Sequence, residues 1–404
     1  MSFDTGNTGF MLLATSLVML MTPGLAFFYG GLVSKKGVLT IMMQSFVSLG
    51  ITTVLWFTVG YSLCFSGDVF GIIGNLDMAF LSGVSMMDVL SPNNNIPLIV
   101  FISYQMMFAV ITPALITGAF AERVRFKAYV LFQILWLLLV YFPFTHMVWG
   151  GGLLASWGVL DFAGGIVVHA TAGMAALASV FFVGKRVERV TEPHSIPLIA
   201  LGTALLWFGW YGFNAGSELR VDGVTALAFL NTDVAASFAA VVWLAIDWKK
   251  MGKPKFVGML TGAVAGLATI TPAAGYVSTS TAALIGCIAS VVCYLAIGLK
   301  NRFGWDDALD VWGVHGMGGI TGVILLGIFA STKVNPAGAD GLLQGNVHFF
   351  LIETAAVVIA AAYAFVISYG MLTLIDKITP VRVDASEQLT GIDAALHGET
   401  AYLM

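Results

Sequence analysis

The chain has 404 residues, of which 58% are hydrophobic and 10% are charged, and its formal net charge is −4. A water-soluble domain carries about 25% charged residues, so this composition excludes a soluble globular protein and indicates an integral membrane protein. The small net charge gives no sign of a nucleic-acid partner. The three cysteines stand singly in apolar runs, a pattern that fits neither a disulfide framework nor a cysteine metal site.

Eleven apolar segments are long enough to cross a bilayer, which takes ~20 mostly apolar residues per helix. The first basic residue is Lys35, so the positively charged start of a secretory signal peptide is missing and the first segment is interpreted as a span. The eighth segment is the shortest and is rich in glycine. In chain order the predicted spans cover about residues 8–33, 40–66, 96–121, 127–147, 162–183, 195–216, 223–247, 256–272, 278–298, 308–330 and 346–376.

The basic residues predict the orientation of these spans. If the N-terminus lies outside, every one of the 18 lysines and arginines except Arg220 and Lys333 falls in a cytoplasmic segment. This is the distribution that the positive-inside rule requires, and one span more or fewer would destroy it. We therefore predict an all-α multi-pass protein of the cell membrane, with the N-terminus outside and the C-terminus inside.

Two histidines stand in matching apolar contexts, each after a valine and each with a glycine four residues later. His169 lies eight residues after Asp161 in the fifth span, and His315 lies eight residues after Asp307 in the tenth. Eight helical residues extend ~12 Å, which reaches the middle of a ~30 Å hydrocarbon core. The fifth and tenth spans run in opposite directions, so equivalent histidines predict an inverted repeat of five spans with its site at mid-membrane.

The histidine pair permits three interpretations. Each imidazole could make a structural hydrogen bond, the two could ligate a haem iron, or they could line a conduction path. In an apolar lumen, neutral imidazoles can donate and accept hydrogen bonds for a small polar solute or pass on a proton. An ionisable group inside a membrane span is costly, so a functional role is the default expectation.

Aromatic and polar residues at the outer ends of the spans form a second candidate group. Trp149 follows the fourth span, Phe108 lies in the third, and Ser217 ends the sixth. An indole face, a phenyl face and a hydroxyl would suit a small cation, although an aromatic belt or core position explains each aromatic equally well. Asp161 and Asp310 lie at the starts of the fifth and tenth spans, where an aspartate commonly caps a helix.

Taken together, seven stretches resemble the ammonium transporter family (Amt/Mep/Rh), in particular the prokaryotic Amt branch. They run from one end of the chain to the other and are specific as a set. These stretches are TPGLAFFYGGLV at 22–33, GAFAERVRF at 118–126, HMVWGGGLLASWGVLDFAGGIVVH at 146–169, WFGWYGFNAGS at 207–217, TPAAGYV at 271–277, DDALDVWGVHG at 306–316 and GIDAALHGETAY at 391–402.

The resemblance implies a function and a role for each candidate residue, with no cofactor and no metal. It implies a homotrimer that transports ammonium, with one pore in each subunit between the repeat halves. Tyr104 is counted among the substrate-binding residues of the outer vestibule, although many members have a phenylalanine there. The implied roles are an outer ammonium site at Trp149, Phe108 and Ser217, a gate at Phe108 and Phe213, twin pore histidines at His169 and His315, and support from Asp161 and Asp310.

The predicted domain organisation is a transmembrane domain over 1–376 and a C-terminal cytoplasmic segment over 377–404. The repeat halves cover about 8–183 and 195–330, and the eleventh helix, 346–376, is additional. The resemblance implies that the C-terminal segment packs under neighbouring pores and offers a docking surface for a PII-type (GlnK) regulator. Within the family an ammonium sensor is the alternative function, and a di-histidine haem redox protein is the alternative from another class.

Overall fold

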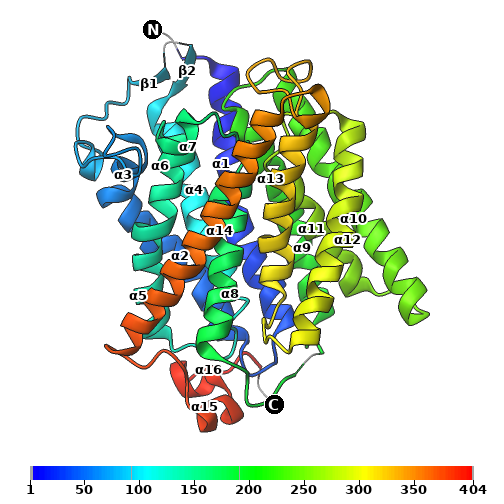
Figure 1. Ribbon diagram of the computed structural model, residues 1–404. Helices are drawn as coiled ribbons and strands as arrows, with labels where there is room; N and C mark the ends of the chain where they lie inside the picture. Colours follow the sequence, from blue (N-terminus) through cyan, green and yellow to red (C-terminus); the bar gives the residue numbers. More distant parts are fainter. Residues whose placement is uncertain (1–2, 92, 191, 403–404) are drawn as a thin grey trace.

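The computed structural model describes residues 3–91, 93–190 and 192–402 as a bundle of long helices with one small hairpin (Figure 1). The elements are α1 (Thr5–Leu32), α2 (Val38–Leu55), η1 (Trp56–Gly60), α3 (Tyr61–Phe65), η2 (Ala79–Leu81), β1 (Val89–Ser91), β2 (Asn94–Pro97), α4 (Leu98–Ile116), α5 (Phe126–Trp136), η3 (Leu137–Tyr141), α6 (Phe142–Trp149), α7 (Leu153–Ser156), η4 (Gly165–Ala170), α8 (Thr171–Val183), α9 (Ile196–Ala215), η5 (Gly216–Glu218), α10 (Gly223–Met251), α11 (Phe256–Ile270), α12 (Thr279–Phe303), η6 (Trp312–Gly316), α13 (Met317–Phe329), η7 (Leu342–Gln344), α14 (Val347–Asp376), α15 (Ala385–Thr390) and α16 (Ile392–His397).

Among the described residues, ten helical segments are long and apolar enough to cross a membrane. The prediction of an all-helical multi-pass membrane protein is therefore confirmed in outline. The predicted span at 256–272 corresponds to the shorter helix α11, whose 15 residues end just before Thr271 and Pro272. Proline has no N–H for a helical hydrogen bond, so the chain leaves the helix there. The sequence did not predict the antiparallel pair β1–β2.

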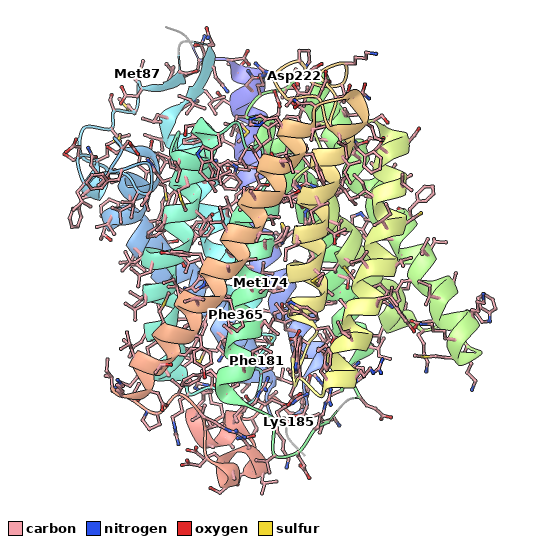
Figure 2. All side chains as sticks on the ribbon, in the orientation of Figure 1. Met87, Met174, Phe181, Lys185, Asp222 and Phe365 are labelled. Carbon is pink, nitrogen blue, oxygen red and sulfur yellow. The ribbon has the colours of Figure 1, made fainter. Side chains whose placement is uncertain are left out.

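The two ends of the bundle carry different parts of the chain. The start of α1 and the β1–β2 pair lie at one end, and α15 and α16 lie at the other (Figure 1). We call these the outer and inner ends, after the orientation that the sequence predicts. Figure 2 shows Asp222 at the outer end and Lys185 at the inner end, with Met174, Phe181 and Phe365 between them.

Local sequence explains where the long helices start and stop, as α10 illustrates. The Asp222 carboxylate accepts the N–H groups of Val224 and Thr225, and the Thr225 hydroxyl accepts the N–H of Asp222, so both form a capping box. This arrangement satisfies main-chain donors that have no partner inside the helix. At the other end Gly252 adopts φ +71°, which favours glycine and ends the helix.

The two histidine-bearing spans touch through reciprocal glycine contacts. A Cβ at Gly319 would lie 2.7 Å from the Cβ of His169, and a Cβ at Gly173 would lie 3.0 Å from the carbonyl carbon of His315. Each glycine stands four residues after the histidine of its own span. Only glycine permits so close an approach of the two backbones. Both histidines also lie in π-helical turns, η4 and η6, which are wider than the α-helix around them.

The C-terminal segment packs against the inner end of its own chain. The Asp393 carboxylate accepts the N–H groups of Leu39 and Thr40 at 2.9 and 2.8 Å, where α2 begins. Glu387 forms a two-pronged pair with Arg125 at 2.7 and 3.0 Å. The described part of this segment is therefore ordered, while its predicted position under neighbouring pores concerns other chains.

Candidate functional site

A vestibule of about 430 Å³ opens at the outer end and brings together residues from several spans and loops. Trp149 at the end of α6, Phe108 in α4 and Ser217 in η5 all line it. The Phe108 ring meets the Trp149 ring edge-on, with centroids 5.9 Å apart and planes at 89°. The three residues that the sequence nominated for an outer cation site thus surround one cavity.

Asp161 lines this vestibule and makes hydrogen bonds to the residues around it. It is 5% exposed, and its main-chain carbonyl accepts the Trp149 indole N–H at 2.8 Å. At 2.6–3.1 Å its carboxylate accepts the main-chain N–H groups of Gly164, Gly165, Ile166 and Val167. These are the unsatisfied donors at the start of the fifth span, and a negative charge is stabilised there. Asp161 therefore caps the helix that carries His169.

Tyr104 is fully buried beside the vestibule, and the residues found to line this cavity do not include it. Its hydroxyl lies 2.9 Å from the carbonyl oxygens of Gly212 and Phe213 and 3.2 Å from the Ser217 hydroxyl. Tyr104 thus ties α4 to the end of α9. A phenylalanine could not make these hydrogen bonds. The tyrosine hydroxyl therefore holds the Phe213 main chain and the Ser217 hydroxyl in position without lining the cavity itself.

Two stacked phenyl rings separate the outer vestibule from the interior. Phe108 and Phe213 lie with ring centroids 4.2 Å apart and planes at 30°. Both side chains are 1% exposed. Phe108 lines the vestibule, and Phe213 lines the small cavity below. The pair therefore closes the path in this structure, at the place where the resemblance implied a gate.

The lumen below the stack is narrow and almost entirely apolar. Its free volume is about 10 Å³, and its walls include Leu25, Ile111, Val168 and Trp210 beside the two histidines. A single water molecule needs ~10–15 Å³, so a hydrated ion cannot fit. A bare ion would lose its hydration with no charged group to replace it, at a cost of several kcal/mol.

His169 and His315 face each other across this lumen. Their Nδ1 atoms lie 3.3 Å apart, and their rings stack with centroids 5.3 Å apart. When both are neutral, one Nδ1 carries the hydrogen and the other accepts it, so the accepting ring holds its own proton on Nε2. The Nε2 of His169 has no hydrogen-bond partner among the described residues. That atom is available to a small polar molecule in the lumen.

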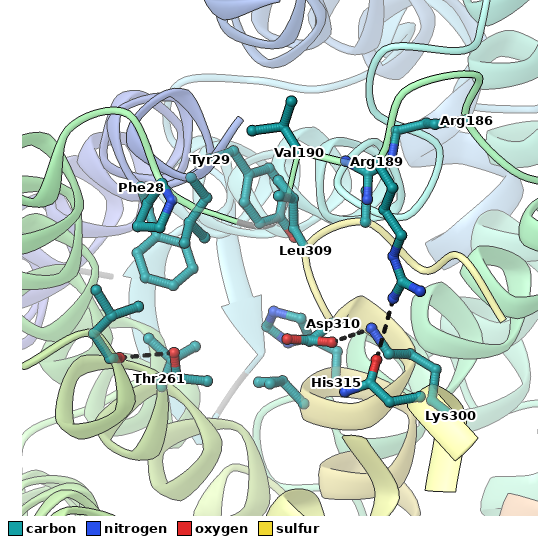
Figure 3. A pocket seen from close by; sticks show the side chains of 17 residues that line it. Phe28, Tyr29, Arg186, Arg189, Val190, Thr261, Lys300, Leu309, Asp310 and His315 are labelled. Carbon is teal, nitrogen blue, oxygen red and sulfur yellow. Dashed lines mark hydrogen bonds and ion pairs between the residues drawn. The ribbon is translucent and has the colours of Figure 1, made fainter. Parts of the chain in front are cut away.

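A second vestibule, of about 260 Å³, lies at the inner end and begins at His315 (Figure 3). Lys300 pairs there with Asp310, and its Nζ donates to the carbonyl of Asp307 at 2.8 Å. Arg186 and Arg189 also line the cavity. The lumen and this vestibule share His315, Phe28 and Val264 as lining residues, so the apolar lumen meets the charged inner vestibule at His315.

The expectation that Asp310 caps the tenth span is wrong, because Asp307 holds that position. The Asp307 carboxylate accepts the N–H groups of Val311 and Trp312 at 3.1 and 2.9 Å. Asp310 instead points its carboxylate at Lys300 and adopts φ +60°.

Two residues of the path carried no signal in the sequence analysis. Trp210 lines the lumen and stacks on His169 with centroids 5.5 Å apart, and its indole donates to Thr271. It stands within the stretch that ends at Ser217, but a tryptophan in a span is usually a core residue. Lys300 was counted only as one of the inner basic residues, and its sequence position did not reveal that it turns into the vestibule.

The chain is similar to known proteins over nearly its whole length. Residues 9–402 match the model of the Ammonium Transporter Family. The ammonium transporter Amt1 of Archaeoglobus fulgidus is 46% identical over 400 residues, which cover 98% of this chain and 99% of that protein. The crystal structure of Candida albicans Mep2 is similar with a TM-score of 0.89 at 36% identity, over 95% of this chain and 88% of that one. A structure of a sensor Amt protein is also similar, with a TM-score of 0.89 at 29% identity, over 97% of this chain and 98% of that one.

Proposed function

We propose, from the premise that this chain belongs to the ammonium transporter family, that it captures ammonium in the outer vestibule and conducts ammonia past its two histidines. Family membership makes it a multi-pass membrane transporter and not an enzyme. One observation carries the mechanism proposed here. The Nδ1 atoms of two buried imidazoles lie 3.3 Å apart in an apolar lumen between the two vestibules.

Capture is the first step. Trp149 and Phe108 offer aromatic faces to a cation, an attraction of about 0.5–2 kcal/mol, and the Ser217 hydroxyl offers an oxygen. Potassium and ammonium ions are similar in size, so this site alone separates them poorly. Ammonium can lose a proton and potassium cannot, and the apolar lumen therefore provides the selection.

Deprotonation and conduction follow. The Phe108–Phe213 stack must part for passage, since its rings are in contact. Ammonia crosses the lumen at far lower cost than any ion and hydrogen-bonds to Nε2 of His169. In this step Nε2 of His169 accepts the proton that ammonium gives up, the hydrogen on Nδ1 of His169 moves to Nδ1 of His315, and Nε2 of His315 releases its proton on the inner side, which makes transport electrogenic. Asp161 supports this path by fixing both Trp149 and the start of the histidine helix.

The architecture that we propose is eleven spans in an inverted repeat, with the N-terminus outside, in a homotrimer of the cell membrane. The reciprocal contacts of Gly173 and Gly319 and the opposite positions of the two chain ends support the repeat and the odd number of spans (Figure 1). The inner end, with its ordered C-terminal helices, is where a PII-type (GlnK) regulator would dock. Failure of such a protein to co-purify in its ADP-bound state would argue against that partner.

The decisive test is electrophysiology of purified protein in liposomes on a solid-supported membrane, with ammonium, methylammonium and potassium compared. Wild-type protein should give ammonium-evoked currents and none with potassium. His169→Ala and His315→Ala should each abolish the current or admit potassium. Unchanged current and unchanged selectivity in both variants would sink the mechanism. The same flux assay separates transport from sensing, because a pure sensor would bind ammonium without current.

The haem alternative does not fit the residues present. An iron ligated by two imidazoles stands between their nitrogens, and at ~2 Å per bond, the usual length for imidazole on a divalent metal, those nitrogens would be ~4 Å apart. Here they are 3.3 Å apart, the rings are stacked, and the lumen offers about 10 Å³. A porphyrin needs far more space.

A further inference from the structure

The mouths of the pore are built on the same main-chain plan at both ends. Asp161 at the outer end and Asp307 at the inner end each cap the helix that carries a histidine eight residues later. Three residues after each aspartate the backbone takes a positive φ, at Gly164 with +117° and at Asp310 with +60°. The two ends can therefore be compared position by position.

A hydrogen-bond donor from the preceding span contacts the capping aspartate at both mouths. The Trp149 indole donates to the Asp161 carbonyl at 2.8 Å, and Lys300 Nζ donates to the Asp307 carbonyl at 2.8 Å. The positive-φ positions correspond as well. A Cβ at Gly164 would lie 3.5 Å from the Trp149 ring, and the Asp310 side chain at the equivalent inner position contacts Lys300. Lys300 thus occupies the inner position that Trp149 occupies outside.

The chemistry at the two equivalent positions is opposite. The indole offers an electron-rich face to a cation that arrives from solution. Lys300 is itself an ammonium group, with a side chain that is 4% exposed, held between a carbonyl oxygen and a carboxylate. Those two oxygens are the acceptors that a free ammonium ion would seek.

We propose that Lys300 is a tethered ammonium that fills the inner cation site and so makes the two mouths bind ammonium unequally. The inference rests on the proposed transport of ammonium through this pore. With Lys300 in place, ammonium on the inner side finds Asp310 and the Asp307 carbonyl already occupied. Capture is then weak from the inside and strong from the outside, where Trp149 leaves its site open.

The test measures half-saturating ammonium separately at each mouth. An affinity tag on the C-terminus sorts liposomes into those that expose the inner end to the bath and those that expose the outer end. Wild-type protein should need more ammonium from the inner side. In Lys300→Met the half-saturating ammonium at the inner mouth should fall on the order of tenfold. This is the scale of one hydrogen bond to a charged group, which ammonium gains when Lys300 is removed. The outer value should stay within about twofold, because substitutions at distant sites act independently.

Three further variants decide between this role and a purely structural one. Lys300→Arg keeps the charge and should behave as wild type. Lys300→Gln removes the charge and frees the Asp310 carboxylate, while it can still donate to the Asp307 carbonyl. Its inner value should fall in the same direction as in Lys300→Met, which keeps the test valid if the methionine variant folds poorly. Lys249→Met, at an exposed inner lysine outside the vestibule, is the matched control and should change neither value.

The outcomes separate the inference from the function on which it rests. Absence of any ammonium current in wild type would refute the proposed transport. A normal current with the same inner half-saturation in wild type, Lys300→Met and Lys300→Gln would overturn the role of Lys300 alone. Ammonium should also raise the melting temperature of Lys300→Gln in detergent more than that of wild type, because only the variant leaves the Asp310 carboxylate free for ammonium.

Discussion

The outer and inner vestibules share a backbone design but are held together by different forces. The outer one depends on main-chain hydrogen bonds to Asp161 and on aromatic contacts around Phe108. The inner one depends on ion pairs, with Asp310 bound to Lys300 and Asp306 bound to Arg186. The same main-chain arrangement thus carries opposite side-chain chemistry at the two ends, an aromatic ring outside and a lysine inside.

The largest expected effect is on the capping aspartates. Asp161→Ala would strip four main-chain amides of their acceptor, whereas Asp307→Ala would strip two. A buried donor left without an acceptor costs about 1–3 kcal/mol, so Asp161→Ala should lose roughly 4 kcal/mol of stability or more and Asp307→Ala roughly half as much. Thermal denaturation in detergent measures both, and equal losses would mean that the amide count does not set the difference.

The next effect tests how much the buried ion pairs at the inner end contribute to the stability of the protein. Asp306 is buried and pairs with Arg186 at 2.8 Å and with the buried Arg123 at 3.6 Å. Asp306→Ala leaves the buried Arg123 without a carboxylate partner and Arg186 with Glu122 alone, and it should cost about 3–5 kcal/mol. Asp384→Ala, which removes a 73% exposed partner of Arg125, should cost about 1 kcal/mol or less.

The same pair predicts a pH dependence. Burial alone would raise the pKa of Asp306, but hydrogen bonds from Arg186 and the charge of Arg123 hold it well below its ordinary value. A group whose pKa is depressed on folding stabilises the fold above its unfolded pKa, about 3.9. The difference in melting temperature between wild type and Asp306→Asn should therefore be constant above about pH 5 and shrink below pH 4. A difference that grows on acidification would contradict this sign.

A smaller effect concerns capture at the outer mouth. Trp149→Leu removes the cation–π face and the indole donor, and it should raise half-saturating ammonium from the outer side by about tenfold, the scale of 1–2 kcal/mol. The inner value should not move. Trp157→Leu, at a tryptophan that is 41% exposed at the outer end, is the control. If both variants behave alike, Trp149 is only a packing residue.

The smallest effect is that of the buried tyrosine. Tyr104→Phe should cost about 1 kcal/mol and shift outer half-saturation by less than about fivefold, because the hydroxyl only positions Phe213 and Ser217. Tyr363→Phe removes an exposed hydroxyl that donates to Leu139 and should leave transport unchanged. A change in potassium exclusion by Tyr104→Phe would instead place its hydroxyl on the permeation path.

The sequence predicted the features that depend on spacing along one helix. Hydropathy located the long spans, and the matched distances to Asp161 and Asp307 placed both histidines at similar depth. What failed depends on the direction of a side chain across the bundle. Asp310 lies only three residues from Asp307, and no periodicity tells which one caps the helix. Trp210 and Lys300 acquire their roles from neighbours that are distant in the sequence, which a single chain does not reveal.

The glycine contacts between the fifth and tenth spans also bear on how the protein is made. Gly173 and Gly319 seat two helices whose histidines are 146 residues apart in the chain. During synthesis the first half enters the membrane while its partner surface does not yet exist. The lumen can close only after the helix that carries His315 has been made and packs against the helix that carries His169. The pairing of the two histidines is therefore a late step, because it joins residues 146 positions apart in the chain.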